Sequence, residues 1–171
     1  MTASARFRQA EFPRDRAAVE KLCWDYREDL LALEGDVGQV ARMLFTRAAW
    51  QKMLDSLPDL HARPRGSVLL AEWDGEAVGC GMIHPLSSHD AEIKRVYVAP
   101  KARGTGLGEA LTRELIQQSR DDGFQRILLD TTKASVPAAR LYEKLGFTSR
   151  GPYTQMATET KDILIFFELT L

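Results

Sequence analysis

The sequence predicts one mixed α/β domain, and three observations support this prediction. The chain has 171 residues, of which 44% are hydrophobic and 27% are charged, which is typical of one soluble domain with a sizeable core. Apolar residues at helical spacing recur between short apolar or alternating runs that are typical of strands. No internal repeat, low-complexity tract or linker divides the chain, so a single domain over residues 1–171 is the simplest interpretation.

The first third of the chain is predicted to be mainly helical. Residues 7–12 alternate weakly and indicate a first strand, after which Asp15 lies at the start of an amphipathic helix. The apolar face of that helix repeats through Val19, Leu22, Cys23, Tyr26, Leu30 and Leu33. Gly35 and Gly38 are expected to end it. A second helix is predicted over about residues 40–57, with four candidate core residues: Leu44, Trp50, Met53 and Leu54.

Strands are predicted mainly in the second part of the chain. Residues 68–73 and 77–83 flank Asp74-Gly75, a pair that favours the tight turn of a β-hairpin. This part of the sheet is therefore expected to be antiparallel. Apolar runs indicate three further strands, at residues 92–98, 127–129 and 163–169.

Two further helices are indicated among these strands. The first runs from Leu107 to about Asp121, and Gly123 follows its end. The second is expected to begin after Ser135, which can serve as its N-terminal cap, and to end near Gly146.

Composition and charge exclude several classes of function. A net charge of −1 provides no general attraction to nucleic acid or to an anionic membrane. The longest apolar run, residues 163–167, is far too short to cross a bilayer, and the charged N-terminal stretch is unlike a secretory signal. Cys23 and Cys80 lack the spacing of a disulfide framework or a zinc site, so no metal is expected and a reducing, cytoplasmic setting fits best.

The most informative segment is a strand that leads into a glycine-rich turn and then a helix, residues 92–108. Gly104, Gly106 and Gly108 allow a tight turn and a close approach of the backbone to a ligand. The helix that follows presents unpaired N–H groups and the positive end of its dipole, an arrangement that binds phosphate. Arg103 adds a positive charge with a planar set of donors.

Three kinds of phosphate-binding turn are compatible with glycines of this density. A dinucleotide-binding turn requires a third glycine one residue later than Gly108, although Asp130 lies at a suitable distance for a ribose contact. No βαβ unit is indicated near the N-terminus, and the Gly-Lys-Ser/Thr of a P-loop is absent from the sequence. The third pattern, Arg-x-x-Gly-x-Gly, is matched by Arg103, Gly106 and Gly108.

That third pattern resembles the pyrophosphate signature of the GCN5-related N-acetyltransferases (GNAT). Residues 92–98 resemble the fourth strand of the family and residues 126–131 the fifth. Residues 135–147, with the pattern Ala-x-x-Leu-Tyr-x-x-x-Gly-Phe, resemble the helix that follows. The resemblance is good over residues 66–171 and extends to residues 7–65 only in layout.

The resemblance implies a fold and an activity. The fold is a mostly antiparallel sheet of about six to seven strands, with splayed fourth and fifth strands and about four flanking helices. The activity is transfer of an acetyl group from acetyl-CoA to a primary amine by direct attack in a ternary complex, by a monomer or homodimer. A non-catalytic acyl-CoA sensor is the alternative, and an oxidoreductase that uses a dinucleotide is a third hypothesis.

The resemblance also assigns residues to the cofactor. The backbone of the fourth strand is expected to pair with the pantetheine arm, and the N–H of Val98 to face the thioester oxygen. Many family members have Asn where this chain has Ser135, so the serine could act only as a helix cap. The expected cofactor-binding residues are Val96, Tyr97, Val98, Arg103, Gly104, Thr105, Gly106, Leu107, Gly108, Ser135 and Tyr142.

Two residues are the catalytic candidates. Tyr142 is the candidate general acid, because a phenol is protonated at neutral pH; the alternative is that it only packs within its helix. Glu92 is the candidate general base, acting directly or through water; the alternative is a strand-end charge paired with Lys94. Asp130 and Thr131 are weaker candidates for binding the amine, and Asp130 could instead anchor a loop.

The remaining conspicuous residues carry weaker expectations. His61, His84 and His89 have no partner at metal-ligand spacing, and His84 is expected in an exposed loop. The three tryptophans are expected in the core. Acceptor recognition is expected from residues 30–65 and 151–161. The acceptor stays open between a small amine, an amino acid and a protein amine.

Overall fold

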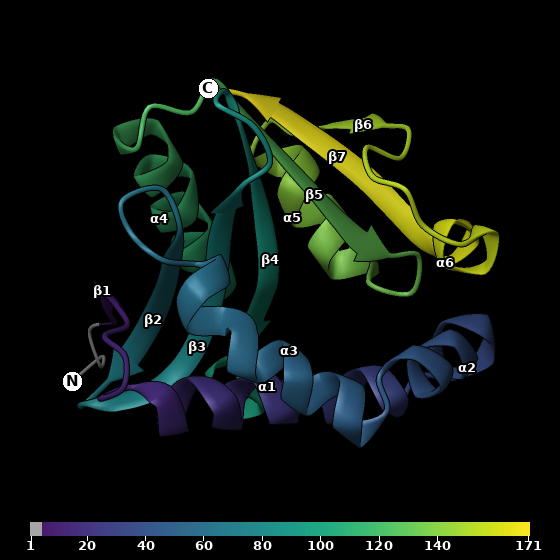
Figure 1. Cartoon of the computed structure of the whole chain (residues 1–171), viewed down its shortest axis with the longest axis horizontal. Coiled ribbons are helices and arrows are strands. Elements are labelled where there is room, and N and C mark those ends of the chain that lie inside the picture. Colours follow the sequence, from purple (N-terminus) through teal and green to yellow (C-terminus); the bar gives the residue numbers. More distant parts are fainter. Residues whose placement is uncertain (1–4) are drawn as a thin grey trace.

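The computed structural model describes residues 5–171, which form a mixed α/β structure around one seven-stranded sheet (Figure 1). The strand order is β1-β2-β3-β4-β5-β7-β6, and every neighbouring pair is antiparallel except β4 and β5. The predicted fold class is therefore confirmed. The strands are β1 (Arg6–Gln9), β2 (Ser67–Trp73), β3 (Glu76–Pro85), β4 (Asp90–Val98), β5 (Arg126–Thr132), β6 (Thr148–Arg150) and β7 (Leu164–Thr170).

The described residues form six α-helices rather than the expected four. They are α1 (Arg16–Leu31), α2 (Gly35–Leu44), α3 (Arg47–Leu60), α4 (Leu107–Asp121), α5 (Val136–Lys144) and α6 (Thr158–Ile163). The sequence did not predict β6 and α6, because both are short and largely polar. The boundaries predicted for α4 agree with the structure.

The helix predicted over residues 40–57 is in fact two helices. Thr46 separates them, and its Oγ1 accepts a 3.2 Å hydrogen bond from the Ala49 N–H at the start of α3. Gly38 was expected to end a helix but lies inside α2, where a Cβ would be only 1.7 Å from the Leu33 carbonyl oxygen. Glycine is therefore required there by close packing. Leu44, a predicted core residue, is 40% exposed.

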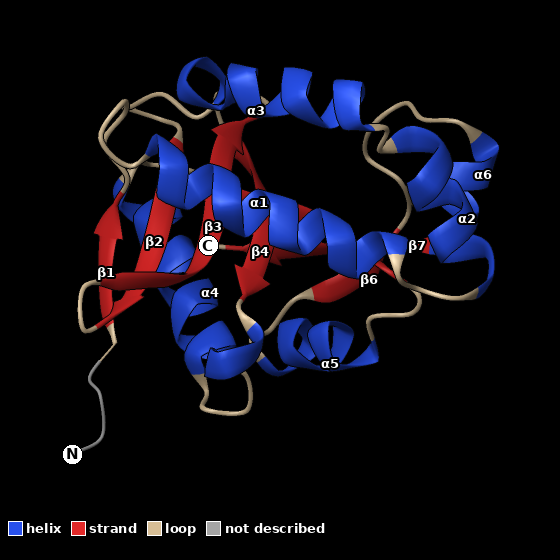
Figure 2. Ribbon diagram, turned by 90° about the horizontal axis from the view of Figure 1, so that it is seen from below, coloured by secondary structure: helices blue, strands red, loops and turns tan. Residues whose placement is uncertain are grey.

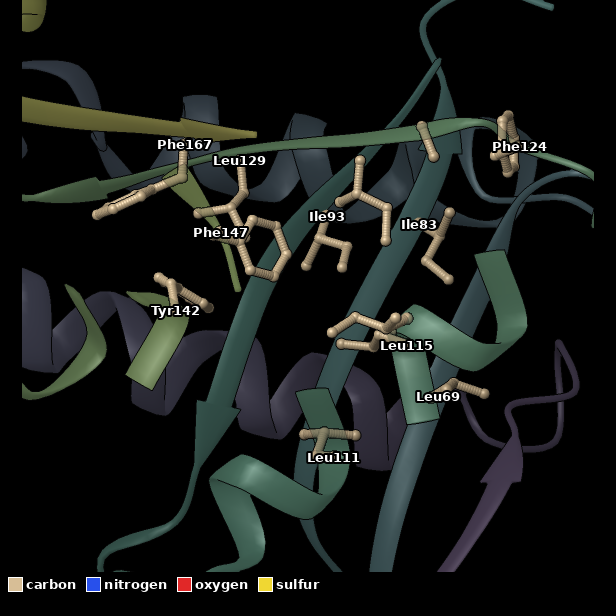
Figure 3. Packing of buried hydrophobic residues seen from close by; sticks show 13 residues of the cluster. Leu69, Ile83, Ile93, Leu111, Leu115, Phe124, Leu129, Tyr142, Phe147 and Phe167 are labelled. Atoms are coloured by element: carbon tan, nitrogen blue, oxygen red, sulfur yellow. The ribbon is translucent and has the colours of Figure 1, made fainter. Parts of the chain in front are cut away.

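Each face of the sheet is covered by helices. One buried cluster joins α1 and α3 to β2, β3 and β4, and it includes Val19, Leu22, Trp50, Leu54, Val68, Leu70, Met82 and Tyr97. The other joins α4 and α5 to the opposite face, and it includes Leu69, Ile83, Ile93, Leu111, Leu115, Leu129, Tyr142, Phe147 and Phe167 (Figures 2 and 3). The change of face between Val68 and Leu69 follows the two-residue period of a strand.

The predicted hairpin is confirmed. Asp74 and Gly75 both have positive φ, 48° and 80°, as a two-residue turn between β2 and β3 requires. Among residues 5–171, the helices are all too short or too polar to cross a membrane.

Candidate active site

The fourth and fifth strands of the sheet separate soon after they meet. The parallel register of β4 and β5 ends at Glu92, which lies opposite Leu128. Beyond that point β4 stays paired with β3 up to Val98, and β5 stays paired with β7 up to Thr132, so the two strands diverge (Figure 1). Diverging strands leave peptide groups available to a ligand that enters between them. The expected splay is therefore confirmed.

The glycine-rich turn leads directly into α4 at the end of this gap. Gly106 precedes the helix with a left-handed backbone, φ 85°, which favours glycine. The first backbone hydrogen bond into the helix joins the Ala110 N–H to the Gly106 carbonyl oxygen at 3.0 Å. Within residues 5–171, the N–H groups of Leu107–Glu109 consequently have no backbone acceptor, and they can bind an anion.

A cavity of about 450 Å³ lies between this turn, β4 and α5, and we call it the α5 cavity. Its wall contains seven of the eleven residues assigned to the cofactor: Val96, Tyr97, Val98, Arg103, Gly108, Ser135 and Tyr142. The other four, Gly104, Thr105, Gly106 and Leu107, form the adjoining turn and do not line the cavity. The structure thus brings the two sequence motifs, 37 residues apart at Thr105 and Tyr142, to one place.

Arg103 is held at the edge of the α5 cavity by three contacts. Its Nε donates to the Val98 carbonyl oxygen at 2.9 Å, and its Nη2 lies 2.5 Å from the carboxylate of Asp29 on α1. The guanidinium carbon lies 5.5 Å from the centre of the Tyr97 ring. The fold thus brings Asp29 of α1 to this arginine, and both side chains stay about half exposed.

Tyr142 combines a packing role with a place in the cavity wall. Its ring packs against Phe147 and Phe167, with ring centres 5.6 and 5.9 Å apart. Burial raises the pKa of Tyr142, and the negative charge of Asp130 raises it further. The phenol therefore keeps its proton at neutral pH, while the packed ring fixes where the hydroxyl lies.

Ser135 does not cap α5 through its side chain. Its Oγ lies 2.9 Å from the Oγ1 of Thr132, at the end of β5, and makes no capping bond to the helix. The prediction of a side-chain cap was therefore wrong, because a hydroxyl partner on the preceding strand competes with the helix N–H groups. The serine does line the α5 cavity.

Glu92 is buried at the point where β4 and β5 part, and its carboxylate has three partners. His84 Nε2 lies 2.6 Å from Oε2, the Tyr153 hydroxyl donates to Oε1 at 2.7 Å, and Lys94 Nζ lies 3.1 Å from Oε1. Burial alone raises the pKa of a carboxyl. Here the hydrogen bonds from His84 and Tyr153 and the charge of Lys94 outweigh burial and lower the pKa of Glu92 to about 2.

Asp130 extends this network to the end of β5. Its Oδ2 accepts a 3.0 Å hydrogen bond from Lys94 Nζ and a 3.2 Å bond from the Tyr153 hydroxyl. The Lys94 pairing considered as the alternative role of Glu92 therefore exists, but Glu92 is buried and the pair is part of a larger network that also holds Asp130. Burial raises the pKa of Tyr153, and the two carboxylates raise it further, so its hydroxyl remains a donor.

One histidine expectation was wrong. His84 is not in an exposed loop; its side chain is 16% exposed and is paired with Glu92. His61 is buried behind it, with the two rings 5.5 Å apart, and its Nδ1 lies 2.8 Å from the Ile83 carbonyl oxygen. Because that carbonyl can only accept, Nδ1 carries the proton. Sequence spacing could not reveal these contacts, which join residues from different elements.

Tyr153 is the site residue that sequence analysis did not single out. It lies in the segment of residues 151–161 that was expected to line a cleft, so only its region was predicted. Its contacts with Glu92 and Asp130 span 61 and 23 residues of sequence. The available signal was a tyrosine in a polar segment before the last strand.

A second cavity, of about 230 Å³, lies beyond the network, and we call it the α2 cavity. Its polar wall includes Lys94, Asp130, Thr131 and Thr132. Its apolar wall includes Leu30, Val37, Val40, Leu44, Phe45, Met156 and Ile163. A smaller hollow of about 110 Å³ shares Tyr142 and Val96 with the α5 cavity and Asp130 with the α2 cavity, so the two cavities adjoin.

Comparison with known proteins identifies the family. A family model described as the acetyltransferase (GNAT) family matches residues 16–147. The chain belongs to the GNAT family. The match includes the splayed strands, the glycine-rich turn and α5, so the resemblance inferred from residues 92–147 is confirmed.

Individual relatives of this GNAT chain are similar over part of its length. An uncharacterized N-acetyltransferase of Schizosaccharomyces pombe is 41% identical over 92 residues, which are 53% of this chain and 56% of that protein. An uncharacterized N-acetyltransferase of Escherichia coli is 37% identical over 97 residues, 55% of this chain and 58% of that protein. The chain thus spans little more than half the length of these curated relatives.

Solved structures extend the similarity of fold to nearly the whole GNAT chain. A Salmonella typhimurium protein, solved with its cofactor acetyl-CoA, aligns with a TM-score of 0.66 and 22% identity over 98% of this chain and 94% of that one. At this identity the comparison establishes the fold.

Proposed function

We propose that this chain is an N-acetyltransferase that transfers the acetyl group of acetyl-CoA to a primary amine. The observation that supports it most is the shared cavity wall, where the glycine-rich turn, the splayed part of β4 and the Tyr142 side chain meet. Family membership and the acetyl-CoA complex of the Salmonella typhimurium neighbour agree with this proposal. Both cysteines are free and buried, which suits the reducing cytoplasm that we propose as its location.

The residues around the α5 cavity suit acetyl-CoA. The free N–H groups of Leu107–Glu109 would bind the pyrophosphate, and Arg103 would add a positive charge beside them. The unpaired edge of β4 from Val96 to Val98 would bind the amide groups of the pantetheine arm. When bound, acetyl-CoA supplies a thioester acyl group and a thiolate leaving group.

Tyr142 would donate a proton to the thiolate leaving group. The acceptor nitrogen forms the new N–C bond, the C–S bond breaks, and the sulfur gains a proton. Tyr142 remains protonated because its pKa is raised, and it lines both the α5 cavity and the hollow that leads to Asp130. Its hydroxyl would therefore donate to the sulfur as charge develops there.

Glu92 would organise the acceptor side. A carboxylate with a pKa of about 2 is a weak base for an ammonium whose pKa is about 10. We therefore propose that Glu92 orients Tyr153, His84 and Lys94, and that the amine proton leaves through water held by this network. Glu92 would thus position the groups that hold this water, and the proton would pass to the water rather than to the carboxylate.

A thiol-release screen tests the proposal. The protein is incubated with acetyl-CoA and a panel of amines, amino acids and peptides, and free thiol is measured against hydrolysis without acceptor. We expect at least one acceptor to raise thiol release and to become acetylated. The Tyr142→Phe variant should lose about tenfold or more in kcat while its Kd for CoA and its unfolding midpoint stay close to those of the parent. CoA binding without turnover on any acceptor would support a sensor instead.

A further inference from the structure

Two buried hydrogen-bond donors beside the α2 cavity lack a partner. Trp50 Nε1 and Arg95 Nη1 are both inaccessible to solvent, and neither has an acceptor among residues 5–171. Both residues line a third cavity, of about 210 Å³, which we call the Trp50 cavity. A buried donor without a partner is destabilising, and more so when it is charged. Two such donors around one cavity indicate an acceptor group that comes from outside the chain.

No group in the wall of the Trp50 cavity satisfies these donors. Tyr26, Leu30 and Phe45 form its largely apolar part. Asp130 is the carboxylate in this wall, and it already accepts from Lys94 and Tyr153. Within residues 5–171, the Arg95 guanidinium consequently has neither an ion pair nor a side-chain hydrogen bond.

The backbone places Arg95 in this wall by an irregularity of β4. Met82 lies opposite Lys94, whereas Cys80 lies opposite Tyr97, so Arg95 and Val96 together face a single residue of β3. This β-bulge gives Arg95 a positive φ of 52°, which is rare and unfavourable for a non-glycine residue. Strain of this kind is often found at binding sites.

Trp50 is also fixed in position. It is only 5% exposed, and its ring packs against Phe45 and Tyr26 with ring centres 5.1 and 6.4 Å apart. The indole N–H therefore has a defined direction before any ligand arrives. A rigid N–H and a guanidinium in the wall of one cavity suit a carboxylate, whose two oxygens can accept from both and whose single negative charge matches the unpaired positive charge.

We propose that the acceptor is a free amino acid with an apolar side chain. Its carboxylate binds Arg95 and Trp50, its amine lies toward Asp130 and the hollow beside Tyr142, and its side chain occupies the α2 cavity. Tyr26, Leu30 and Asp130 line all three of these spaces, so they adjoin one another. That this amino acid receives the acetyl group rests on the proposed function, whereas the carboxylate site rests on the two unpaired donors.

A binding experiment tests the carboxylate site without turnover. The probes are L-leucine, leucinamide, which keeps the carbonyl but loses the charge, and 3-methylbutylamine, which lacks both. Indole N–H resonances are followed by NMR, and Trp50→Phe identifies the Trp50 signal. From the shift of the Trp50 signal we expect the Kd for leucine to be at least about tenfold lower than the Kd for leucinamide. The signals of Trp24 and Trp73 should stay unchanged. Equal binding of all three probes, or no shift at Trp50, would overturn the inference.

Variants complete the test. Arg95→Gln should raise the Kd for leucine about tenfold or more and remove most of the preference over leucinamide. Arg65→Gln is the matched control, because its Nε is also buried without a partner while its guanidinium stacks on Phe124, away from the three cavities. Equal effects of Arg95→Gln and Arg65→Gln would contradict the inference.

The two proposals can fail separately. If leucine binds at Trp50 but no amine is acetylated, the carboxylate site stands and the proposed activity fails. If amines without a carboxylate are acetylated as well as leucine, the activity stands and the inference about the acceptor fails.

Discussion

The Tyr153 hydroxyl donates a 2.7 Å hydrogen bond to Glu92, and this contact links the segment before the last strand to the point where β4 and β5 part. The hydroxyl oxygen also lies 3.2 Å from Asp130 Oδ2, so its single proton is shared between the two carboxylates. Because one phenol joins both carboxylates, it fixes their position beside the α2 cavity. The proposed acceptor side of the site is therefore built from three segments that are distant in sequence.

Replacement of Tyr153 by Phe should weaken the use of the acceptor amine and leave the binding of acetyl-CoA unchanged. The variant removes both hydrogen bonds but keeps the ring, which packs edge-on against Phe166 at 5.8 Å. We expect kcat/KM for the acceptor to fall about tenfold and stability to fall by about 1–2 kcal/mol. Steady-state kinetics with each substrate varied in turn measures this. A KM for acetyl-CoA that rises as much as the acceptor KM would contradict the assigned side of the site.

Replacement of Asp29 by Asn should strengthen CoA binding. In the parent, Asp29 pairs with Arg103, which we assign to the pyrophosphate, and both side chains are about half exposed. Exposed ion pairs contribute at most about 1 kcal/mol, so we expect the Kd for CoA to fall no more than about fivefold. Calorimetric titration at low and high salt measures the change, and Asp25→Asn, on the same helix and paired with Lys21, is the control. Weaker CoA binding by the Asp29 variant would argue against the assignment of Arg103.

Two glycines of the turn should respond differently to alanine. Gly106 has a φ of 85°, so Gly106→Ala should cost about 1–2 kcal/mol through backbone strain, although no atom lies within 4 Å of the new Cβ. Gly108 has a helical backbone, and its Cβ would lie an ordinary 3.8 Å from the Val98 side chain. Gly108→Ala should therefore leave stability unchanged or raise it by up to about 1 kcal/mol. Chemical denaturation of both variants checks this, and an equal loss at both positions would be inconsistent with it.

Stability should fall in mildly acidic solution because of His61. Burial lowers the pKa of His61 to about 4, from an ordinary value of 6.5. As the pH falls, His61 is therefore protonated in the unfolded chain at a higher pH than in the folded chain. The contribution of neutral His61 is complete above pH 6.5 and is lost between about pH 6.5 and 4, by an amount on the order of 3 kcal/mol.

Unfolding free energies measured from pH 7.5 to 4 test this dependence. His61→Asn keeps a donor for the Ile83 carbonyl but does not titrate, so its stability should vary less over this range. His89→Asn, at an exposed position whose Nδ1 lies 2.8 Å from the Ser88 hydroxyl, should keep the dependence of the parent. Identical profiles for the parent and both variants would show that another group is responsible.

Local patterns predicted the elements that depend on local chemistry. The Asp74-Gly75 turn, the strands on either side of it and the bounds of α4 follow from residues that are neighbours in sequence. Predictions were wrong where a tertiary contact decides the local structure. Gly38 permits close packing inside α2 instead of ending a helix. Ser135 forms a hydrogen bond with Thr132 instead of capping α5. A short polar strand such as β6 carries little signal of its own.

The sequence by itself determined the proposed donor side of this protein, because the glycine-rich turn, the strand before it and the Tyr142 helix are contiguous motifs whose spacing is informative. Only the tertiary structure decided the proposed acceptor side. The partners of Glu92, the role of Tyr153 and the unpaired donors of Trp50 and Arg95 come from elements far apart in the chain. Their interaction depends on how helices and strands pack, which no local pattern records.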